Sequence, residues 1–330
     1  MSGGSSPYHL RLNKSIERNL FVDLLKIVGR HTNISDYWYV GFAGPFSEDF
    51  KTIHGALRIT KMKSVEIDEN VYKRQIFNYS PSFITYMHKN FAEFLRGDFY
   101  QSDRGKSNAI TWLDYAAAHE TRAQLTEFQG LVASAIPLDV IKITLNANVA
   151  CVKGNTAADK LQCFKHRLGA LCPADISEES LLQKNYPDTL MRCIKLSLDG
   201  LSSKRNNYFH PLASFIYQDT NNLMLTVTGI VLENSDASTI SEFEKVSRVN
   251  HWKFSNTTWR NPRRIRVPSL SIKERIELDS KLPCDGDDRG TILMSALNFH
   301  PEEEEQNGIL ALENYADYYR AYSLFTKVVV

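Results

Sequence analysis

Residues 38–44 read WYVGFAG, a short apolar run that ends in a turn with two glycines. Three further runs of the same kind follow: SVEID at 64–68, ITWLDY at 110–115 and IKITLN at 141–146. Each ends in a turn residue, an acid or an amide, as buried parallel strands do where they deliver polar groups to one edge of a sheet. Four such endings in order predict a parallel sheet with a binding site along that edge.

The segments between these runs have apolar residues at helical spacing, which predicts helices that connect parallel strands by right-handed crossovers. The strands expected are 37–42, 62–67, 83–86, 109–113 and 140–145, followed by an antiparallel hairpin of 209–217 and 223–232 around the turn QDTNN. The helices expected are 13–28, one that Pro45 to Asp49 open, one from Glu69, 91–95, one through 125–135, and 187–200.

Other segments have weaker patterns. The polar stretch 97–107 is predicted to be a loop, and 151–175 a short helix with loops. Beyond 233 the pattern fades, and we expect only a short helix at 271–278, an acidic turn at 301–305 and a final helix at 310–325.

The composition excludes several classes of protein. With 330 residues, 43% hydrophobic and 23% charged, the chain can bury a large core, and its net charge of +1 argues against a uniformly basic nucleic-acid binder. Its five cysteines contain no C-x-x-C pair, so we expect free thiols and no metal site. No apolar run is long enough for a membrane span, and the leader at 1–6 is unlike a signal peptide. We therefore expect a cytoplasmic protein.

The strand endings, the hairpin and the run PSLSIKER at 268–275 resemble the class I S-adenosylmethionine-dependent methyltransferases. The chain is most similar to bacterial proteins described as putative O-methyltransferases. The resemblance implies an α/β, Rossmann-like methyltransferase sandwich, a mostly parallel sheet with an antiparallel terminal hairpin and a C-terminal extension. It also implies three parts: a flexible leader and N-terminal helix at 1–36, the methyltransferase domain at 37–232, and an extension at 233–330 that forms the substrate side or an interface.

The same resemblance implies S-adenosylmethionine as the cofactor and a role for the turn after the first strand. In these enzymes a glycine-rich turn lets the backbone approach the amino-acid part of the cofactor. The turn here consists of Gly41, Phe42, Ala43 and Gly44, and it lacks the usual G-x-G spacing. The structural alternative is that the two glycines only allow the strand and helix to pack tightly.

An acid at the end of the second strand binds the ribose hydroxyls in this family. Glu66 matches that position, and Asp68 is the alternative, although it could equally cap the helix that follows. After the third strand, where the family has a residue near the adenine, Asn90 is the candidate and Asp98 competes with it.

The fourth and fifth strands end where such enzymes hold the methyl acceptor. Asp114 and Tyr115 are the candidate catalytic residues, but the D-P-P-Y motif of many amino-group methyltransferases is absent. Asp114 would orient or deprotonate an acceptor hydroxyl, or else cap the next helix. Asn146 would bind the acceptor or brace the loop after Asp114, and His119 is the nearest candidate base.

The predicted function is methyl transfer to an oxygen of an unknown acceptor. Two alternatives stay open: a catalytically silent module of the same fold that binds a protein or nucleic-acid partner, and a pocket for a different nucleotide. Self-association is also open, and no membrane partner is expected. Nucleic acid would bind through the basic stretch that contains Arg260, Arg263, Arg264 and Arg266. The alternative is that Arg263, Arg264 and Arg266 neutralise the acids at 302–305 or other acids within the molecule.

Overall fold

The computed structural model describes residues 11–199, 201, 207–219 and 221–322, so the leader at 1–6 lies outside the described residues. By internal contacts the chain forms two units. The described part of the first comprises Val22–Ile216 and Asn222–Arg263, and that of the second comprises 11–21, 217–219, 221 and 264–322. The elements of the sheet that form the predicted site belong to the first unit.

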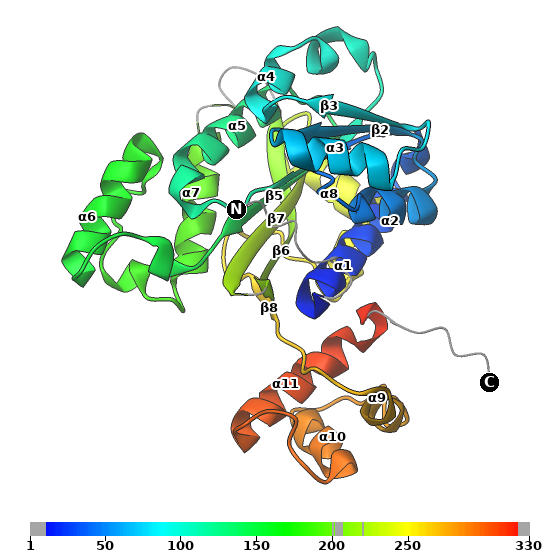
Figure 1. Cartoon of the computed structure of the whole chain (residues 1–330), viewed down its shortest axis with the longest axis vertical. Helices are drawn as coiled ribbons and strands as arrows, with labels where there is room; N and C mark the ends of the chain where they lie inside the picture. Colours follow the sequence, from blue (N-terminus) through cyan, green and yellow to red (C-terminus); the bar gives the residue numbers. More distant parts are fainter. Residues whose placement is uncertain (1–10, 200, 202–206, 220, 323–330) are drawn as a thin grey trace. The chain divides into compact units, whose positions relative to one another are not determined.

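The sheet has eight strands in the order β3-β2-β1-β4-β5-β7-β6-β8 (Figure 1). Strands β1 to β5 are parallel to their neighbours, and β7 pairs antiparallel with β5. This order, with a reversed strand inserted after β5, is that of the class I methyltransferase fold. The bounds are β1 Trp38–Gly41, β2 Lys61–Glu66, β3 Ile84–His88, β4 Ala109–Asp114, β5 Val140–Asn146, β6 Tyr208–Asp219, β7 Asn222–Leu232 and β8 Arg263–Ile265.

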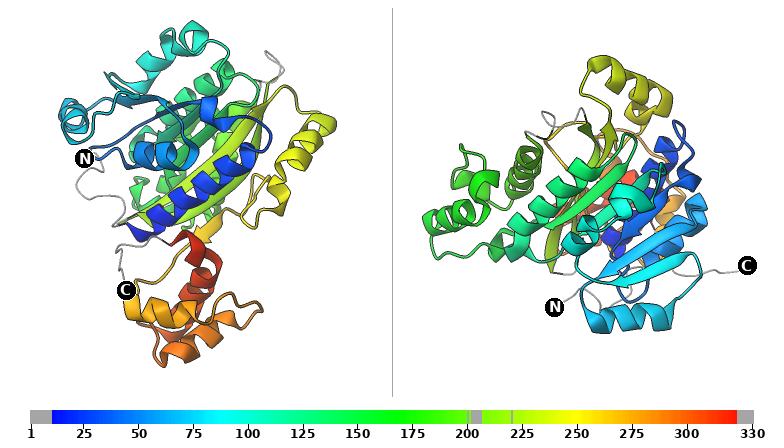
Figure 2. Two further views of the ribbon diagram at one scale, coloured as in Figure 1. Left: turned by 90° about the vertical axis from the view of Figure 1, so that its right-hand side faces the viewer. Right: turned by 90° about the horizontal axis from the view of Figure 1, so that it is seen from above.

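Helices α4, α5 and α7 lie on one face of the sheet, and α2 and α3 lie on the other (Figures 1 and 2). On the first face, Phe94, Phe128 and Leu190 belong to one buried cluster with the sheet residues Leu113 and Ile143. The bounds of the helices up to the hairpin are α1 Leu12–Val28, α2 Glu48–Leu57, α3 Glu69–Asn78, α4 Phe91–Arg96, α5 Thr121–Ser134, α6 Ala157–Leu168 and α7 Tyr186–Leu198.

The predicted strands are confirmed to within two residues at each end. The prediction that Pro45 lies in the first turn of a helix is wrong, since α2 begins at Glu48. Ser47 precedes it in a left-handed conformation, with φ of 50°, and therefore keeps 44–47 in a separate turn.

The predicted loop at 97–107 contains a π-helical turn, Phe99–Asp103. The segment is polar overall, but it contains two buried aromatic side chains, Phe99 and Tyr100, and a buried cation, Arg104. Arg104 forms an ion pair with Asp139 at 2.6 Å, with both side chains 2% exposed. Arg104, one of the polar residues of this segment, therefore forms a buried ion pair that the sequence pattern did not indicate.

The part after the hairpin has more regular structure than expected. Helices α8, Ala237–Ser247, and α10, Arg289–Leu297, were not predicted. Helix α9, Ile272–Asp279, is confirmed, and Ser271 and Glu274 cap it reciprocally. Helix α11, Glu305–Tyr318, begins five residues before the predicted start at 310 and ends seven before the predicted end at 325, and residues 323–325 of that prediction lie outside the described residues.

Candidate functional site

The turn after β1 lies at the carboxyl edge of the sheet, between the ends of β2 and β4. Gly41 is opposite Ser64 on one side and Trp112 on the other. Gly44 has a φ of +57°, a conformation that other residues adopt only at an energetic cost. The carbonyl of Ala43, which is fully buried, accepts a hydrogen bond from the Ser47 amide. Gly44 therefore allows a tight turn at the edge of the sheet, and Gly41 is the last residue of β1.

Phe42 connects this turn to the end of β4. Its ring centroid is 5.5 Å from that of Tyr115 and 5.9 Å from that of Phe91. The structure thus brings together Phe42, predicted to contact the cofactor, and Tyr115, predicted to be catalytic. The residues at the ends of β1 and β4 form one aromatic surface, although 73 positions separate them in the sequence.

Glu66 ends β2 and is half-buried. Its two carboxylate oxygens accept hydrogen bonds from the Asp68 amide at 2.9 Å and from Gln75 Nε2 at 3.4 Å. Burial raises the pKa of Glu66 above its usual value, and the backbone hydrogen bonds oppose that change. Asp68, the alternative ribose ligand, is exposed and caps α3 by accepting from the amides of Asn70 and Val71.

Asn90 follows β3 and caps α4, where its side chain accepts from the Glu93 amide at 2.8 Å. The amide of Lys89 donates to the Glu66 carbonyl, so the ends of β2 and β3 lie next to each other. Asp98 is exposed, and its carbonyl accepts the amides of the π-helical turn. Asn90 therefore lies beside Glu66 at the predicted edge and has a capping role there.

Asp114 ends β4 opposite Thr144 of β5 and is half-buried. The next residue, Tyr115, donates its hydroxyl hydrogen bond to Glu127 of α5. Burial and the negative charge of Glu127 raise the pKa of Tyr115 well above its usual value, so its phenol is protonated at neutral pH. Burial also raises the pKa of Glu127, while the hydrogen bond from Tyr115 lowers it. Sequence reasoning did not identify Glu127.

Asn146 ends β5 and is 5% exposed. Its Nδ2 donates to the Ala116 carbonyl at 3.1 Å, and its Oδ1 accepts from the Asn148 amide at 3.0 Å. The contact with Ala116 is the one that the bracing role of Asn146 needs, and both roles stay predictions. Gln124 donates to the Ala117 carbonyl in the same loop. His119, at the far end of the loop, has a side chain that is 75% exposed.

The sequence matches the model of the family described as "Putative O-methyltransferase" over residues 6–330. The chain belongs to this family. The predicted resemblance to class I methyltransferases is thereby confirmed, and the strand order agrees with it. Comparison with curated proteins gives no match.

Solved structures similar to this methyltransferase-family chain include the following three. One is Trm1 from Pyrococcus horikoshii with S-adenosyl-L-methionine, at 11% identity and a TM-score of 0.44, over 69% of this chain and 57% of that one. Cofactor-bound Rv0187 from MTB has 11% identity, a TM-score of 0.38 and coverage of 71% and 84%. The plantazolicin methyltransferase BpumL with SAH has 8% identity, a TM-score of 0.38 and coverage of 65% and 82%. The chain thus spans little more than half the length of Trm1.

The arginines of the basic stretch have separate surroundings. Arg266 forms an ion pair with Glu302 at 3.6 Å, as the intramolecular alternative predicted, and the Arg264 carbonyl accepts from the Tyr318 hydroxyl. Arg260 and Arg263 are exposed. In the described part of the family member, no helix is long and apolar enough to cross a membrane, and no three His, Cys, Asp or Glu side chains cluster as metal ligands.

Proposed function

We propose that the chain transfers a methyl group from S-adenosylmethionine to an oxygen atom of an acceptor. Membership of the family supports this reaction class, and the position of Glu66 is the observation that carries the assignment of the cofactor site. Glu66 ends β2, next to the strand whose turn contains Gly41 and Gly44. A carboxylate has about four acceptor positions, so the hydrogen bonds from Asp68 and Gln75 leave capacity for ribose hydroxyls. The acceptor oxygens of Glu66 therefore fit the ribose hydroxyls of the cofactor.

Two further residues support the same site. Ile67, which sequence reasoning missed, is 69% exposed directly beside Glu66 and offers apolar surface to an adenine ring. Asn90 follows the neighbouring strand β3, so its side-chain amide lies at the same carboxyl edge of the sheet as Glu66. When bound, S-adenosylmethionine supplies a methyl group already activated by a positively charged sulfur. The rings of Phe42 and Tyr115 favour a cation, because aromatic faces carry partial negative charge.

The acceptor would lie at the end of β4. Asp114 would take the proton of the acceptor hydroxyl, whose oxygen would receive the methyl group as the bond from that group to the cofactor's sulfur breaks. Tyr115 keeps its own proton, since its pKa is raised and its hydroxyl is bound to Glu127. Its role is to hold the aromatic surface in place rather than to act as a base. Asn146 fixes the loop between these residues and α5, which aligns the acceptor.

Calorimetry with S-adenosylmethionine and its demethylated product tests this proposal. Glu66→Gln should weaken cofactor binding by about tenfold, because it removes a charge-assisted acceptor. Glu69→Gln is the matched control, since Glu69 is exposed three positions further on and pairs only with Lys73 among the described residues. Absence of binding heat with the unmodified chain would refute the proposal. Survival of binding in Phe42→Asp would show that the cofactor turn is wrongly assigned.

A second candidate is the catalytically silent module of the same fold. The turn Gly41 to Gly44 without G-x-G spacing and the absence of a D-P-P-Y motif at Asp114 favour it. The two candidates differ in the calorimetric experiment and in turnover: the silent module gives no demethylated product with any acceptor fraction.

A further inference from the structure

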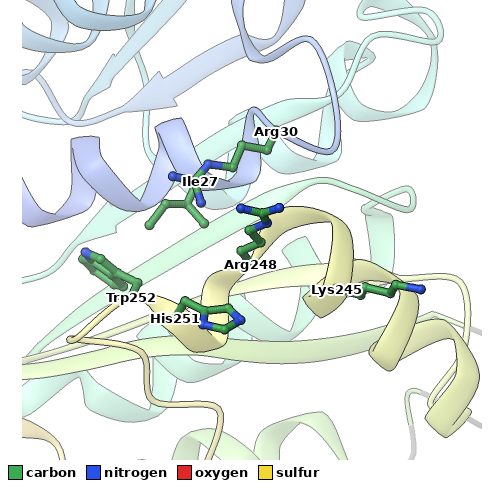
Figure 3. Close-up of a pocket in the computed structure, with 6 residues that line it drawn as sticks. All are labelled: Ile27, Arg30, Lys245, Arg248, His251 and Trp252. Carbon is green, nitrogen blue, oxygen red and sulfur yellow. The ribbon is translucent and has the colours of Figure 1, made fainter.

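An open pocket of about 800 Å³ lies at the end of the sheet opposite to the predicted cofactor site. It is lined by the end of α1 and by α8 with the turn η8, Val249–His251, that follows it. Helix α1 ends shortly before β1 begins, and α8 follows β7, which runs antiparallel to β5. Both connections therefore lie at the amino ends of the parallel strands. The residues that line the pocket are Ile27, Arg30, Lys245, Arg248, His251 and Trp252 (Figure 3).

This pocket is positively charged. Arg30, Lys245 and Arg248 carry fixed positive charges at neutral pH, and His251 adds a further nitrogen donor or acceptor. Within the described residues, no carboxylate forms an ion pair with any of these four. The acid nearest to Arg248 in the sequence, Glu244, uses its two oxygens to accept from His210 and Asn250. Three cations of the lining thus have no ion pair among the described residues, so the pocket favours an anionic ligand, although Glu244 keeps its negative charge on α8.

The pocket is held in shape by backbone contacts. Arg30 Nη1 donates to the Ser247 carbonyl at 3.2 Å and so joins α1 to the end of α8. Arg248 has a φ of 58°, and its amide donates to the Glu244 carbonyl. This left-handed residue ends the helix and turns its side chain toward Arg30 (Figure 3). The two guanidinium groups thus come from segments 218 positions apart.

Trp252 provides a flat apolar wall at the other end of the pocket from Lys245 (Figure 3). Its ring is half-buried and contacts Phe254, with centroids 5.5 Å apart. His251 and Trp252 also line a second pocket of about 370 Å³, which includes Lys253 and Arg263. The linings of the two pockets share His251 and Trp252, and together they contain five Lys and Arg side chains: Arg30, Lys245, Arg248, Lys253 and Arg263. We refer to the two pockets together as the cationic groove.

We propose that this groove binds the phosphate of a nucleotide, with Arg30 and Arg248 on the phosphate and Trp252 against the base. Arginine forms paired hydrogen bonds with phosphate oxygens, and aromatic rings stack on bases of any sequence. A volume of about 800 Å³ suits one nucleotide, because small-ligand pockets hold about 300 to 1,000 Å³. The nucleotide is either free or part of a single strand that continues into the second pocket. This inference does not depend on the proposed methyl transfer.

Binding of two probes tests the inference: adenosine monophosphate by calorimetry, and a short fluorescein-labelled oligoadenylate by fluorescence anisotropy. Arg248→Gln should weaken binding about tenfold, since it removes a charge-assisted phosphate contact. Arg58→Gln is the matched control, because Arg58 is an exposed arginine that also ends a helix, with a φ of 59° and its amide bound to the His54 carbonyl. Lys245→Gln, at an exposed helical position, is a second variant with the same expected direction.

The outcomes separate the sources of the phosphate. Binding of the mononucleotide at least as tight as that of the oligonucleotide assigns a free nucleotide; tighter binding of the oligonucleotide, with strong salt dependence, assigns a strand. Absence of binding by both probes, or equal weakening by Arg248→Gln and Arg58→Gln, overturns the inference. S-adenosylmethionine binding measured on each variant shows whether the fold and the cofactor site are intact, so failure here is distinguishable from failure of the proposed function.

Discussion

Replacing Arg104 with methionine should destabilise the first unit by about 3 to 5 kcal/mol, because it leaves a buried carboxylate without its counter-charge. Arg104 and Asp139 are each 2% exposed, and their closest atoms are 2.6 Å apart. Asp139 keeps the amides of Ile136 and Ala109 as donors, at 2.9 and 2.8 Å. These remaining hydrogen bonds favour the lower end of the range, about 3 kcal/mol.

The pH dependence of this loss gives a second, independent readout. Burial raises the pKa of Asp139, whereas Arg104 lowers it, so the pKa in the variant should rise further. A carboxyl with a raised folded-state pKa favours folding fully below its unfolded pKa and loses that contribution as the pH rises through the folded pKa. The destabilisation by Arg104→Met should therefore be largest at neutral pH and shrink as the carboxyl becomes protonated.

Urea unfolding followed by circular dichroism measures both quantities. Arg192→Met is the control, since Arg192 pairs with Asp175 at the surface, where the side chains are 39% and 74% exposed, and it should change stability far less. The double-mutant cycle with Asp139→Asn isolates the pairwise energy. A loss below about 1 kcal/mol for Arg104→Met, as for a surface pair, would refute the assignment of a buried ion pair.

Two further changes test the candidate site. Glu127→Gln keeps an acceptor for the Tyr115 hydroxyl and removes a carboxyl whose pKa burial raises. The free energy of unfolding, measured by urea titration, should therefore fall less between acidic and neutral pH in this variant. An unchanged pH dependence would contradict the raised pKa of Glu127. Asn146→Leu removes both loop hydrogen bonds and should lower turnover more than cofactor affinity. The control is Asn108→Ala, which also loses two hydrogen bonds, to the Pro137 carbonyl and to Asp139, at the other end of β4. Equal effects of the two variants on turnover would exclude the bracing role.

Strand β5 was predictable from sequence because it is mostly apolar, and it is buried at every position. The same reasoning placed Glu66 and Asp114 at strand ends, where the fold alone sets their position. It failed for 97–107 because the buried partner of Arg104 is Asp139, which is distant in sequence and has no local signal. It also missed α8, α10 and the three-residue strand β8.

Side-chain roles were harder to predict than strand ends. The sequence indicated that Tyr115 follows β4, but its hydrogen bond depends on the register of α5 against the sheet, which places Glu127 within reach. The groove has the same origin, since Arg30 and Ser247 meet across 217 positions only after β7 reverses direction. The hydrophobic periodicity of a sequence predicts each helix or strand separately, whereas these contacts depend on how two such elements pack together.

The direction of the strands also separates the two proposed sites physically. The cofactor turn follows the carboxyl end of β1, and the cationic groove is formed by segments at the amino ends of β1 and β5. A strand rises about 3.3 Å per residue, so the seven residues of β5 span about 20 Å between the two edges. Ligands at that separation share no contact residue. Adenosine monophosphate and S-adenosylmethionine should therefore bind without competing, and direct competition between them would mean that both occupy the cofactor turn.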